Sequence, residues 1–160
     1  MIFPSIKIFG ISNCLMIAID IVLMVMLSPD NFSQDSISVE LGSLTVKITG
    51  FDNDRGECWF ALNNSEEIYE SEDSVFIGKI LPIKNGQVTI TIDPLNYGTY
   101  AIKVFHDENS NSELDPDILG IPNEKYGFSN NASGWFGPPS WEKSRFIFNK
   151  KEMTIEITVD

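Results

Sequence analysis

Oxygen-bearing side chains recur at every second residue in one stretch of this chain. The segment reads DENSNSELD, in which Asp107, Asn109, Asn111, Glu113 and Asp115 occupy the alternate positions. Calcium binds six to eight oxygen ligands in flexible geometry, and helix-flanked calcium loops take ligands at the same two-residue spacing. Because a curling chain could place these oxygens around one ion, the spacing predicts a calcium site.

The stretch differs from a helix-flanked calcium loop at two positions. Ser112 stands where that loop has Gly for its sharp turn, and Ile118 stands where it has a bidentate Glu. The preceding residues 100–105 alternate like a strand, so we expect a site between strand and loop whose last carboxylate comes from Asp117 or Glu124. The alternative is an Asn/Asp-rich turn whose side chains cap their own backbone without an ion.

His106 is the only histidine and the obvious candidate for acid-base chemistry near neutral pH. It shares a strand face with Tyr100, Ile102 and Val104, so we expect its imidazole at the rim of the core, holding the backbone of the loop. The sequence shows no nucleophile in a recognisable setting, no zinc-type His/Cys cluster and no Gly-rich phosphate loop. We therefore expect no enzymatic activity, with a hydrolase that uses His106 as the alternative.

The segment from residue 120 to 141 is rich in Gly, Pro and aromatic residues. Loops of this length are usually functional. We expect a binding or accessory module in which the ordered loop presents Tyr126, Trp135 or Trp141 to a glycan, a peptide or a partner protein. The alternative is a purely structural domain whose loop aromatics cover an open sheet face.

Short segments with alternating apolar and polar residues surround these candidates, and this period is typical of half-buried strands. The helix signal is limited to a turn around Ile68 and Tyr69. Because the apolar faces need a second sheet to cover them, we expect an all-β antiparallel sandwich of about seven strands, immunoglobulin-like or transthyretin-like, with one long Asn/Asp/Gly/Pro-rich loop. The expected strands are residues 44–49, the segment around Cys58, Phe60 and Leu62, and residues 75–83, 87–92, 98–106, 144–148 and 153–159. In the second strand we expect Trp59 to face away from the core and to pack under a loop.

The first 29 residues have the character of an export segment. Lys7 precedes an apolar run over residues 8–27. Asp20 would cost about 2.5–3.5 kcal/mol in a permanent membrane span, which favours a cleaved signal peptide. An uncleaved anchor is the alternative, because the run lacks a small-x-small cleavage site. We expect residues 30–41 to form a linker and residues 42–160 a domain in the periplasm, at the cell surface or in the medium, where Cys58 has no partner for an internal disulfide.

The net charge of the chain limits the classes of partner that it can bind. The chain has 160 residues, 42% of them hydrophobic, and a net charge of −12. Only Lys7 and Asp20 among the charged residues lie in the first 29, so the remainder carries the whole imbalance. Such a surface repels nucleic acid. We expect an extracytoplasmic protein or glycan as partner, and membrane contact only through the N-terminal segment.

Several motifs follow one another in the second half of the chain: GTYAIKVFHDEN, LGIPNEKYGFSNNA and FGPPSW. Together they resemble the bacterial family catalogued as domain of unknown function 2141, from about Gly42 to Asp160. This resemblance implies an exported β-sandwich without an assigned activity; Ser112 stands where the family pattern usually has Gly. The segment DPLNYGTYAIKV also resembles transthyretin-like and carboxypeptidase-regulatory sandwiches, which implies the fold alone.

Overall fold

The computed structural model describes residues 39–71, 73–114, 123–135 and 137–160. The expected export segment, most of the expected linker and Asp115 lie outside these residues. The described elements, in chain order, are β1 (Leu41–Thr49), β2 (Glu57–Asn63), α2 (Glu66–Glu70), β3 (Ile77–Pro82), β4 (Gln87–Asn96), β5 (Gly98–Asp107), β6 (Tyr126–Phe128), the 3-10 turn η1 (Ser129–Asn131), α3 (Trp141–Ser144), β7 (Phe146–Phe148) and β8 (Glu152–Thr158). No helix in these ranges is long and apolar enough to cross a membrane.

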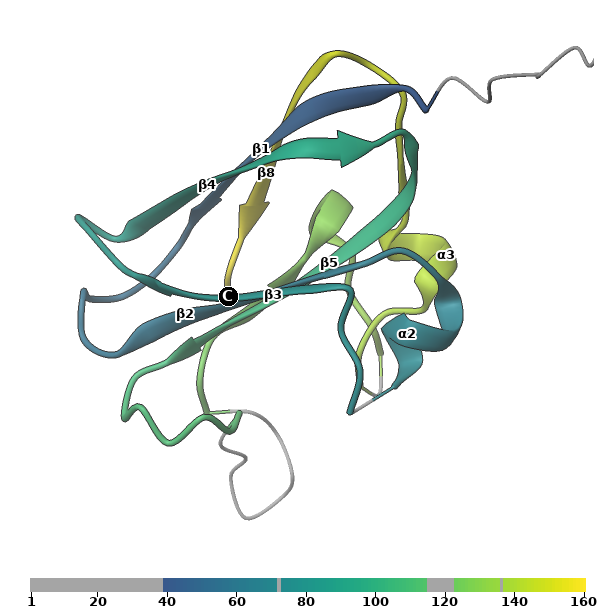
Figure 1. The fold of residues 1–160 in the computed structure, drawn as a ribbon. Helices are drawn as coiled ribbons and strands as arrows, with labels where there is room; N and C mark the ends of the chain where they lie inside the picture. The colour runs from purple at the N-terminus through teal and green to yellow at the C-terminus, as the bar shows by residue number, and fades with distance from the viewer. Residues whose placement is uncertain (1–38, 72, 115–122, 136) are drawn as a thin grey trace, which may run out of the picture. The chain divides into compact units, whose positions relative to one another are not determined.

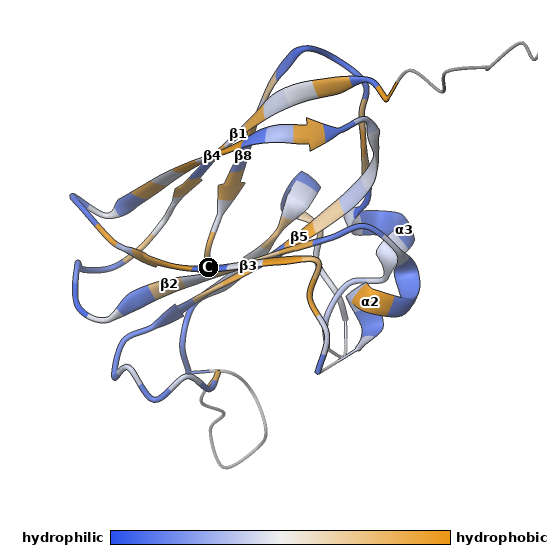
Figure 2. Cartoon of the chain, in the orientation of Figure 1, coloured by the Kyte–Doolittle hydropathy of each residue, from blue (hydrophilic) through white to orange (hydrophobic). Residues whose placement is uncertain are grey.

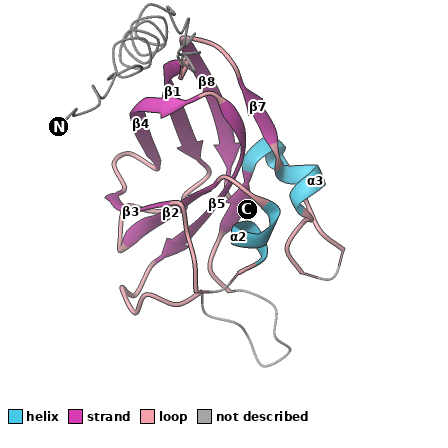
Figure 3. Cartoon of the chain, turned by 45° about the vertical axis from the view of Figure 1, so that its right-hand side comes forward, coloured by secondary structure: helices cyan, strands magenta, loops and turns pink. Residues whose placement is uncertain are grey.

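The strands form two sheets that face one another, as Figures 1 and 3 show. A three-stranded sheet has the order β4-β1-β8, and a five-stranded sheet has the order β3-β2-β5-β6 with β7 also paired to β5. The predicted all-β sandwich is therefore confirmed. One pairing departs from the antiparallel expectation: β8 runs parallel to β1. The reason is that the chain crosses from β7 in one sheet to β8 in the other, instead of returning through a hairpin.

The core lies between the sheets and follows the alternation of the sequence. Figure 2 shows apolar positions recurring along the strands. Burying these side chains between two layers is the main stabilising term of such a fold. Inward residues from both sheets are at most 9% exposed: Leu44, Val46, Ile48, Cys58, Phe60, Leu62, Val88, Ile90, Ile92, Tyr100, Ile102 and Val104. The expected inward orientation of Cys58, Phe60 and Leu62 is thus confirmed.

One strand, β6, falls inside the long segment for which the sequence predicts a loop. It is only three residues long. Its pairing depends on distant backbone groups, since the N–H of His106 donates to Lys125 O at 2.8 Å and the N–H of Asp160 donates to Tyr126 O at 3.1 Å. A strand held by such remote partners leaves no periodic pattern to detect.

A second hydrophobic cluster covers part of the outer face of the five-stranded sheet. It consists of Tyr69 from α2, Ala101 from β5, Phe128 from β6 and Trp141 from α3. The Tyr69 hydroxyl donates to Pro139 O at 2.8 Å and lies 2.9 Å from Ser144 Oγ. Burial raises the pKa of Tyr69, and the hydrogen bond with Ser144 partly opposes this shift. The two short helices therefore shield one part of this face (Figure 3), and a hollow among the described residues lies beside it, at Trp59 and Phe105.

Candidate functional site

The Asp107 carboxylate organises the loop that follows β5. The residue is fully buried, at 0% exposure. Its Oδ1 accepts from the N–H of Asn111 at 3.1 Å, and its Oδ2 accepts from the N–H of Ser112 at 2.8 Å. Oδ2 also accepts from Nε1 of Trp59 on β2 at 3.1 Å. One side chain thus folds the loop around itself and attaches it to the neighbouring strand.

The two asparagines of the predicted calcium loop cap the backbone two residues further on. Asn109 Oδ1 accepts from the N–H of Asn111 at 2.9 Å, and Asn111 Oδ1 accepts from the N–H of Glu113 at 2.8 Å. Ser110, between the two asparagines, and Ser112, after the second, have φ angles of 59° and 71°. This chain of side-chain-capped turns is the arrangement that the ion-free alternative predicts.

The other predicted calcium ligands are spread around this loop. Glu124 is 9% exposed, and its Oε1 accepts from the N–H of Glu108 at 2.9 Å, so it lies against the start of the loop. Glu113 is exposed at the far end. Within the described ranges no three His, Cys, Asp or Glu side chains gather closely enough to hold a metal ion. Because Asp115 lies outside those ranges and the asparagines are not acidic ligands, the calcium site stays a prediction.

His106 is buried at the rim of the core, at 1% exposure. Its Nε2 lies 2.8 Å from Arg55 O, an acceptor, so this nitrogen carries the proton and donates. Nδ1 lies 3.9 Å from Glu108 Oε1 and has no hydrogen-bond partner among the described residues. Phe51 packs edge-on against the ring at 5.2 Å. The imidazole therefore binds the backbone of the turn that precedes β2. The sequence predicts a backbone-holding role for His106 as well, but at the loop that follows β5.

The three aromatic residues proposed to contact a ligand lie in three different environments. Trp141 is 7% exposed and packs against Tyr69 at a ring distance of 5.8 Å. Tyr126 is half-buried beside Phe128, at a ring distance of 5.9 Å. Trp135 is 92% exposed. The position of Trp141 corresponds to the covering role of the structural alternative, whereas Trp135 is free to meet a partner.

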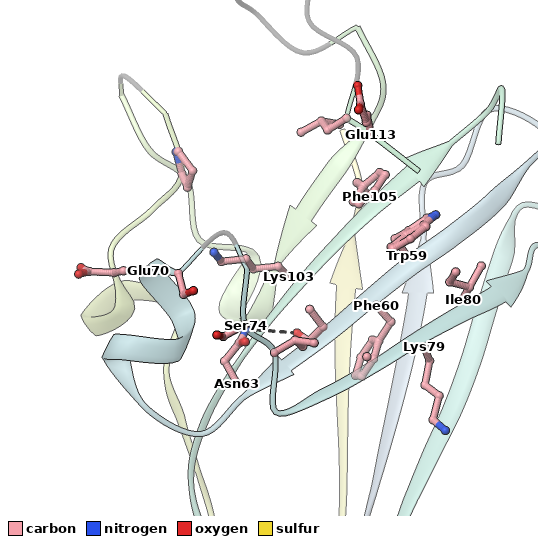
Figure 4. Close-up of a pocket in the computed structure, with 16 residues that line it drawn as sticks. Trp59, Phe60, Asn63, Glu70, Ser74, Lys79, Ile80, Lys103, Phe105 and Glu113 are labelled. Atoms are coloured by element: carbon pink, nitrogen blue, oxygen red, sulfur yellow. Dashed lines mark hydrogen bonds between the residues drawn. The ribbon is translucent and has the colours of Figure 1, made fainter. Parts of the chain in front are cut away.

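A hollow lies on the outer face of the five-stranded sheet, beside the part that the two short helices shield. It has a volume of about 1020 Å³, and Figure 4 shows the residues that line it. We call it the outer groove. Its floor consists of side chains that point away from the core on three adjacent strands: Trp59 and Ala61 on β2, Ile80 on β3, and Lys103 and Phe105 on β5.

Trp59 and Phe105 form a cross-strand aromatic pair on this floor. They are direct partners in the β2–β5 register, and their rings stack at 5.6 Å with an angle of 15° between the planes. Stacking on Phe105 and the hydrogen bond to Asp107 hold the indole in one orientation. Trp59 therefore packs beside the loop and also lines the groove.

No sequence motif predicts this groove. The available signal was the outward position of Trp59 and Phe105 on strands whose inward residues are apolar. Aromatic side chains that gather into one patch on the face opposite the core can mark a binding site, whereas single ones do not. The alternating pattern does not predict that β2 pairs with β5, and this pairing brings the two rings together.

These features define an all-β sandwich domain with an open groove on one outer sheet face. The chain belongs to the family described as "Uncharacterized protein conserved in bacteria (DUF2141)", whose model matches residues 46–156. The resemblance inferred from the sequence motifs is confirmed. No curated protein and no solved structure matches the chain.

Proposed function

We propose that this chain is an exported, non-catalytic binding module that holds its ligand in the outer groove. The observation that carries this proposal is the hollow of about 1020 Å³ with the stacked Trp59–Phe105 pair on its floor. Ligand sites are concave, largely apolar and mostly preformed, with a few polar groups that orient the ligand. The groove has these properties before any ligand arrives.

The state of His106 supports a function without catalysis. A general base must reach the proton that it removes. The imidazole is 1% exposed, and its Nε2 is engaged by Arg55 O. The neighbouring Asp107 carboxylate is equally buried and holds loop N–H groups. These groups stabilise the end of β5 and offer little access to a substrate.

Export is supported by the N-terminal sequence, in which Lys7 precedes the apolar run of residues 8–27. The net charge of −12 disfavours nucleic acid and agrees with an extracytoplasmic partner. Cell fractionation tests this part of the proposal: we expect the protein in the envelope or the medium. Recovery of the intact chain in the cytosol would contradict export.

Calcium is the second part of the proposal, as an ion that stabilises the loop at the end of the groove. Carbonyl and carboxylate oxygens have more than one lone pair, so an oxygen that caps an N–H retains capacity for a cation. The proposed ligands are Asp107, Asn109, Asn111, Glu113, Asp115 and Glu124. Glu113 and Leu114 also line the groove, which would connect ion binding to its shape.

The binding proposal is tested by nuclear magnetic resonance on the ¹⁵N-labelled full-length chain, in a zwitterionic detergent without a sugar headgroup. The chain has three tryptophans, so its indole N–H signals report separately on the groove (Trp59), the exposed loop (Trp135) and the second cluster (Trp141). The probes are neutral oligosaccharides and a neutral capped peptide. We expect the Trp59 signal to shift and the other two to stay in place. A shift of Trp135 alone would move the binding site to the loop, and no shift with any probe would contradict a binding function.

The calcium proposal is tested by thermal melting during a calcium titration. Sites of modest charge bind with dissociation constants of about 10⁻⁴ to 10⁻³ M. At ten times the dissociation constant, linkage contributes about 1.4 kcal/mol, which raises Tm by several degrees. The calcium-induced shift in the Tm of the unmodified chain is compared with the shift in Glu124→Ala and in Asn111→Ala. Magnesium is the control ion. An unchanged Tm up to several millimolar calcium would exclude the site.

A further inference from the structure

The floor of the outer groove offers a carbon surface rather than hydrogen bonds. The only polar atom of the Trp59 side chain, Nε1, is occupied by Asp107 Oδ2 at 3.1 Å. Phe105 has no polar side-chain atom and stacks on the indole at 5.6 Å. A ligand on this floor must therefore present an apolar face. Because both rings are already fixed, binding costs little side-chain entropy.

The backbone beneath the floor has no sheet hydrogen bonds to offer. β2 pairs with β3 on one side and with β5 on the other, so its N–H and C=O groups are used within the sheet. A ligand lying on the face meets side chains only. An extended peptide in this position would leave its own N–H and C=O groups without the strand partners that peptide recognition on sheets uses. The outer edge of β3, which pairs with no further strand in the described part of the chain, would serve a peptide better than the groove does.

The rim of the groove is polar. Among the described residues it includes the carboxylates of Glu70 and Glu113 and the hydroxyl groups of Ser71 and Ser74. Lys103 Nζ already donates to Tyr69 O and lies 4.4 Å from the centre of the Tyr69 ring. In a chain with a net charge of −12, these rim carboxylates disfavour an anionic ligand.

From these features we propose that the outer groove binds a neutral oligosaccharide, an inference that rests on the binding function proposed above. A sugar ring carries its C–H groups on its faces and its hydroxyl groups around its edge. The faces would pack on Trp59, and the hydroxyls would reach the donors and acceptors of the rim. The volume of about 1020 Å³ is at the upper end of the range for small-molecule sites, about 300–1,000 Å³, so a chain of several sugars fits better than a single one.

The experiment is isothermal titration calorimetry of the full-length chain with defined probes. The neutral glycans are cellohexaose, xylohexaose and chitohexaose. The comparison probes are the anionic hexamer of galacturonic acid and a capped neutral peptide of alternating Val and Thr. We expect at least one neutral glycan to bind, and the anionic glycan and the peptide to give no measurable heat.

Ala61→Phe is the variant that blocks the groove without removing a contact. Ala61 faces Gly78 on β3 and Lys103 on β5 in the strand register. Val75 Cγ1 lies 3.3 Å from the position that a Cβ on Gly78 would take, so the space over Gly78 is filled and a phenyl ring at position 61 extends into the groove. We expect native-like unfolding and at least about tenfold weaker glycan binding, as for loss of a central contact.

Trp135→Ala is the matched control, because Trp135 is an exposed tryptophan that does not line the groove. We expect glycan affinity within about twofold of the unmodified chain. Loss of binding in Trp135→Ala together with full binding in Ala61→Phe would overturn the assignment to the groove.

The probes separate the two proposals. Binding of the peptide alone, weakened by Ala61→Phe, would overturn the glycan inference and leave the binding function standing. Binding of the anionic hexamer as tightly as its neutral counterparts would overturn the requirement for a neutral ligand. If no probe binds and the Trp59 indole signal does not shift, both proposals are contradicted.

Discussion

The indole N–H of Trp59 donates a hydrogen bond of 3.1 Å to Oδ2 of Asp107, and this bond joins the floor of the outer groove to the loop after β5. The same carboxylate accepts from the backbone N–H of Asn111 and of Ser112. The orientation of a groove residue and the shape of a loop therefore depend on one buried side chain.

A double-mutant cycle measures this connection. Asp107→Asn replaces one acceptor oxygen by a donor, and Trp59→Phe removes the indole N–H. Because each change alters the same hydrogen bond, we expect a coupling free energy of about 0.5–3 kcal/mol in urea unfolding. The control cycle combines Asp107→Asn with Trp135→Phe, whose ring is 92% exposed, and should give additive effects. Additivity in both cycles would show that the indole bond contributes nothing to stability.

Ser129 should stabilise the junction between β5 and the turn after β6. The residue is fully buried; its hydroxyl accepts from the N–H of Ile102 at 2.9 Å and donates to Ser144 O. In Ser129→Ala both groups lose their partner, at about 1–3 kcal/mol for each buried group left unsatisfied. Chemical denaturation should reveal the loss. Ser133→Ala, at an exposed position nearby, should stay within about 0.5 kcal/mol of the unmodified chain. Equal stability of the two variants would contradict a structural role for the Ser129 hydroxyl.

Asp54 should make stability depend on pH in the acid range. The N–H groups of Gly86 and Asn85 donate to its carboxylate at 2.7 and 2.8 Å and lower its pKa from 3.8. Since the folded pKa lies below the unfolded one, the contribution is fully present above pH 3.8 and is lost as the pH falls through the folded pKa.

The measurement for Asp54 is the stability difference between the unmodified chain and Asp54→Asn across the acid range. We expect the unmodified chain to be more stable at neutral pH and the difference to shrink on acidification. Asp73→Asn, at another exposed position, serves as control. A difference that does not change with pH would rule out this titration as its source.

Cys58 should be unreactive in the folded protein. Burial raises the pKa of its thiol to about 12, and the residue is 0% exposed. The thiolate is the reactive form, so alkylation at neutral pH should require unfolding. Peptide mapping after iodoacetamide treatment, with and without urea, distinguishes Cys58 from Cys14. Labelling of Cys58 in the native protein at the rate seen in urea would contradict its burial.

The raised pKa of Cys58 also predicts alkaline destabilisation. The neutral thiol is compatible with the core, so its contribution is fully present below the unfolded pKa of 9.0 and falls as the pH rises towards about 12. In Cys58→Ala this part of the alkaline loss should disappear. If stability falls with rising pH in the same way in the unmodified chain and in Cys58→Ala, groups other than Cys58 cause the alkaline loss of stability.

The local pattern of the chain determined the two-layer β architecture and the inward residues. Leu44, Val46 and Ile48 alternate with polar residues, and this period is a property of the strand itself. The recurring Asp and Asn residues after β5 likewise indicated a side-chain-ordered loop, because such turns form between neighbouring residues. Contacts of short sequence separation leave their signature in the sequence.

Only the tertiary structure decided which outward side chains meet. The pairing of β2 with β5 places Trp59 beside Phe105, and the end of β5 places Asp107 within hydrogen-bond distance of the indole N–H. The parallel pairing of β1 with β8 and the three-residue β6 also depend on segments far apart in the chain. Strand register and order are set by packing over the whole domain, so a groove built across three strands has no local sequence pattern that could reveal it.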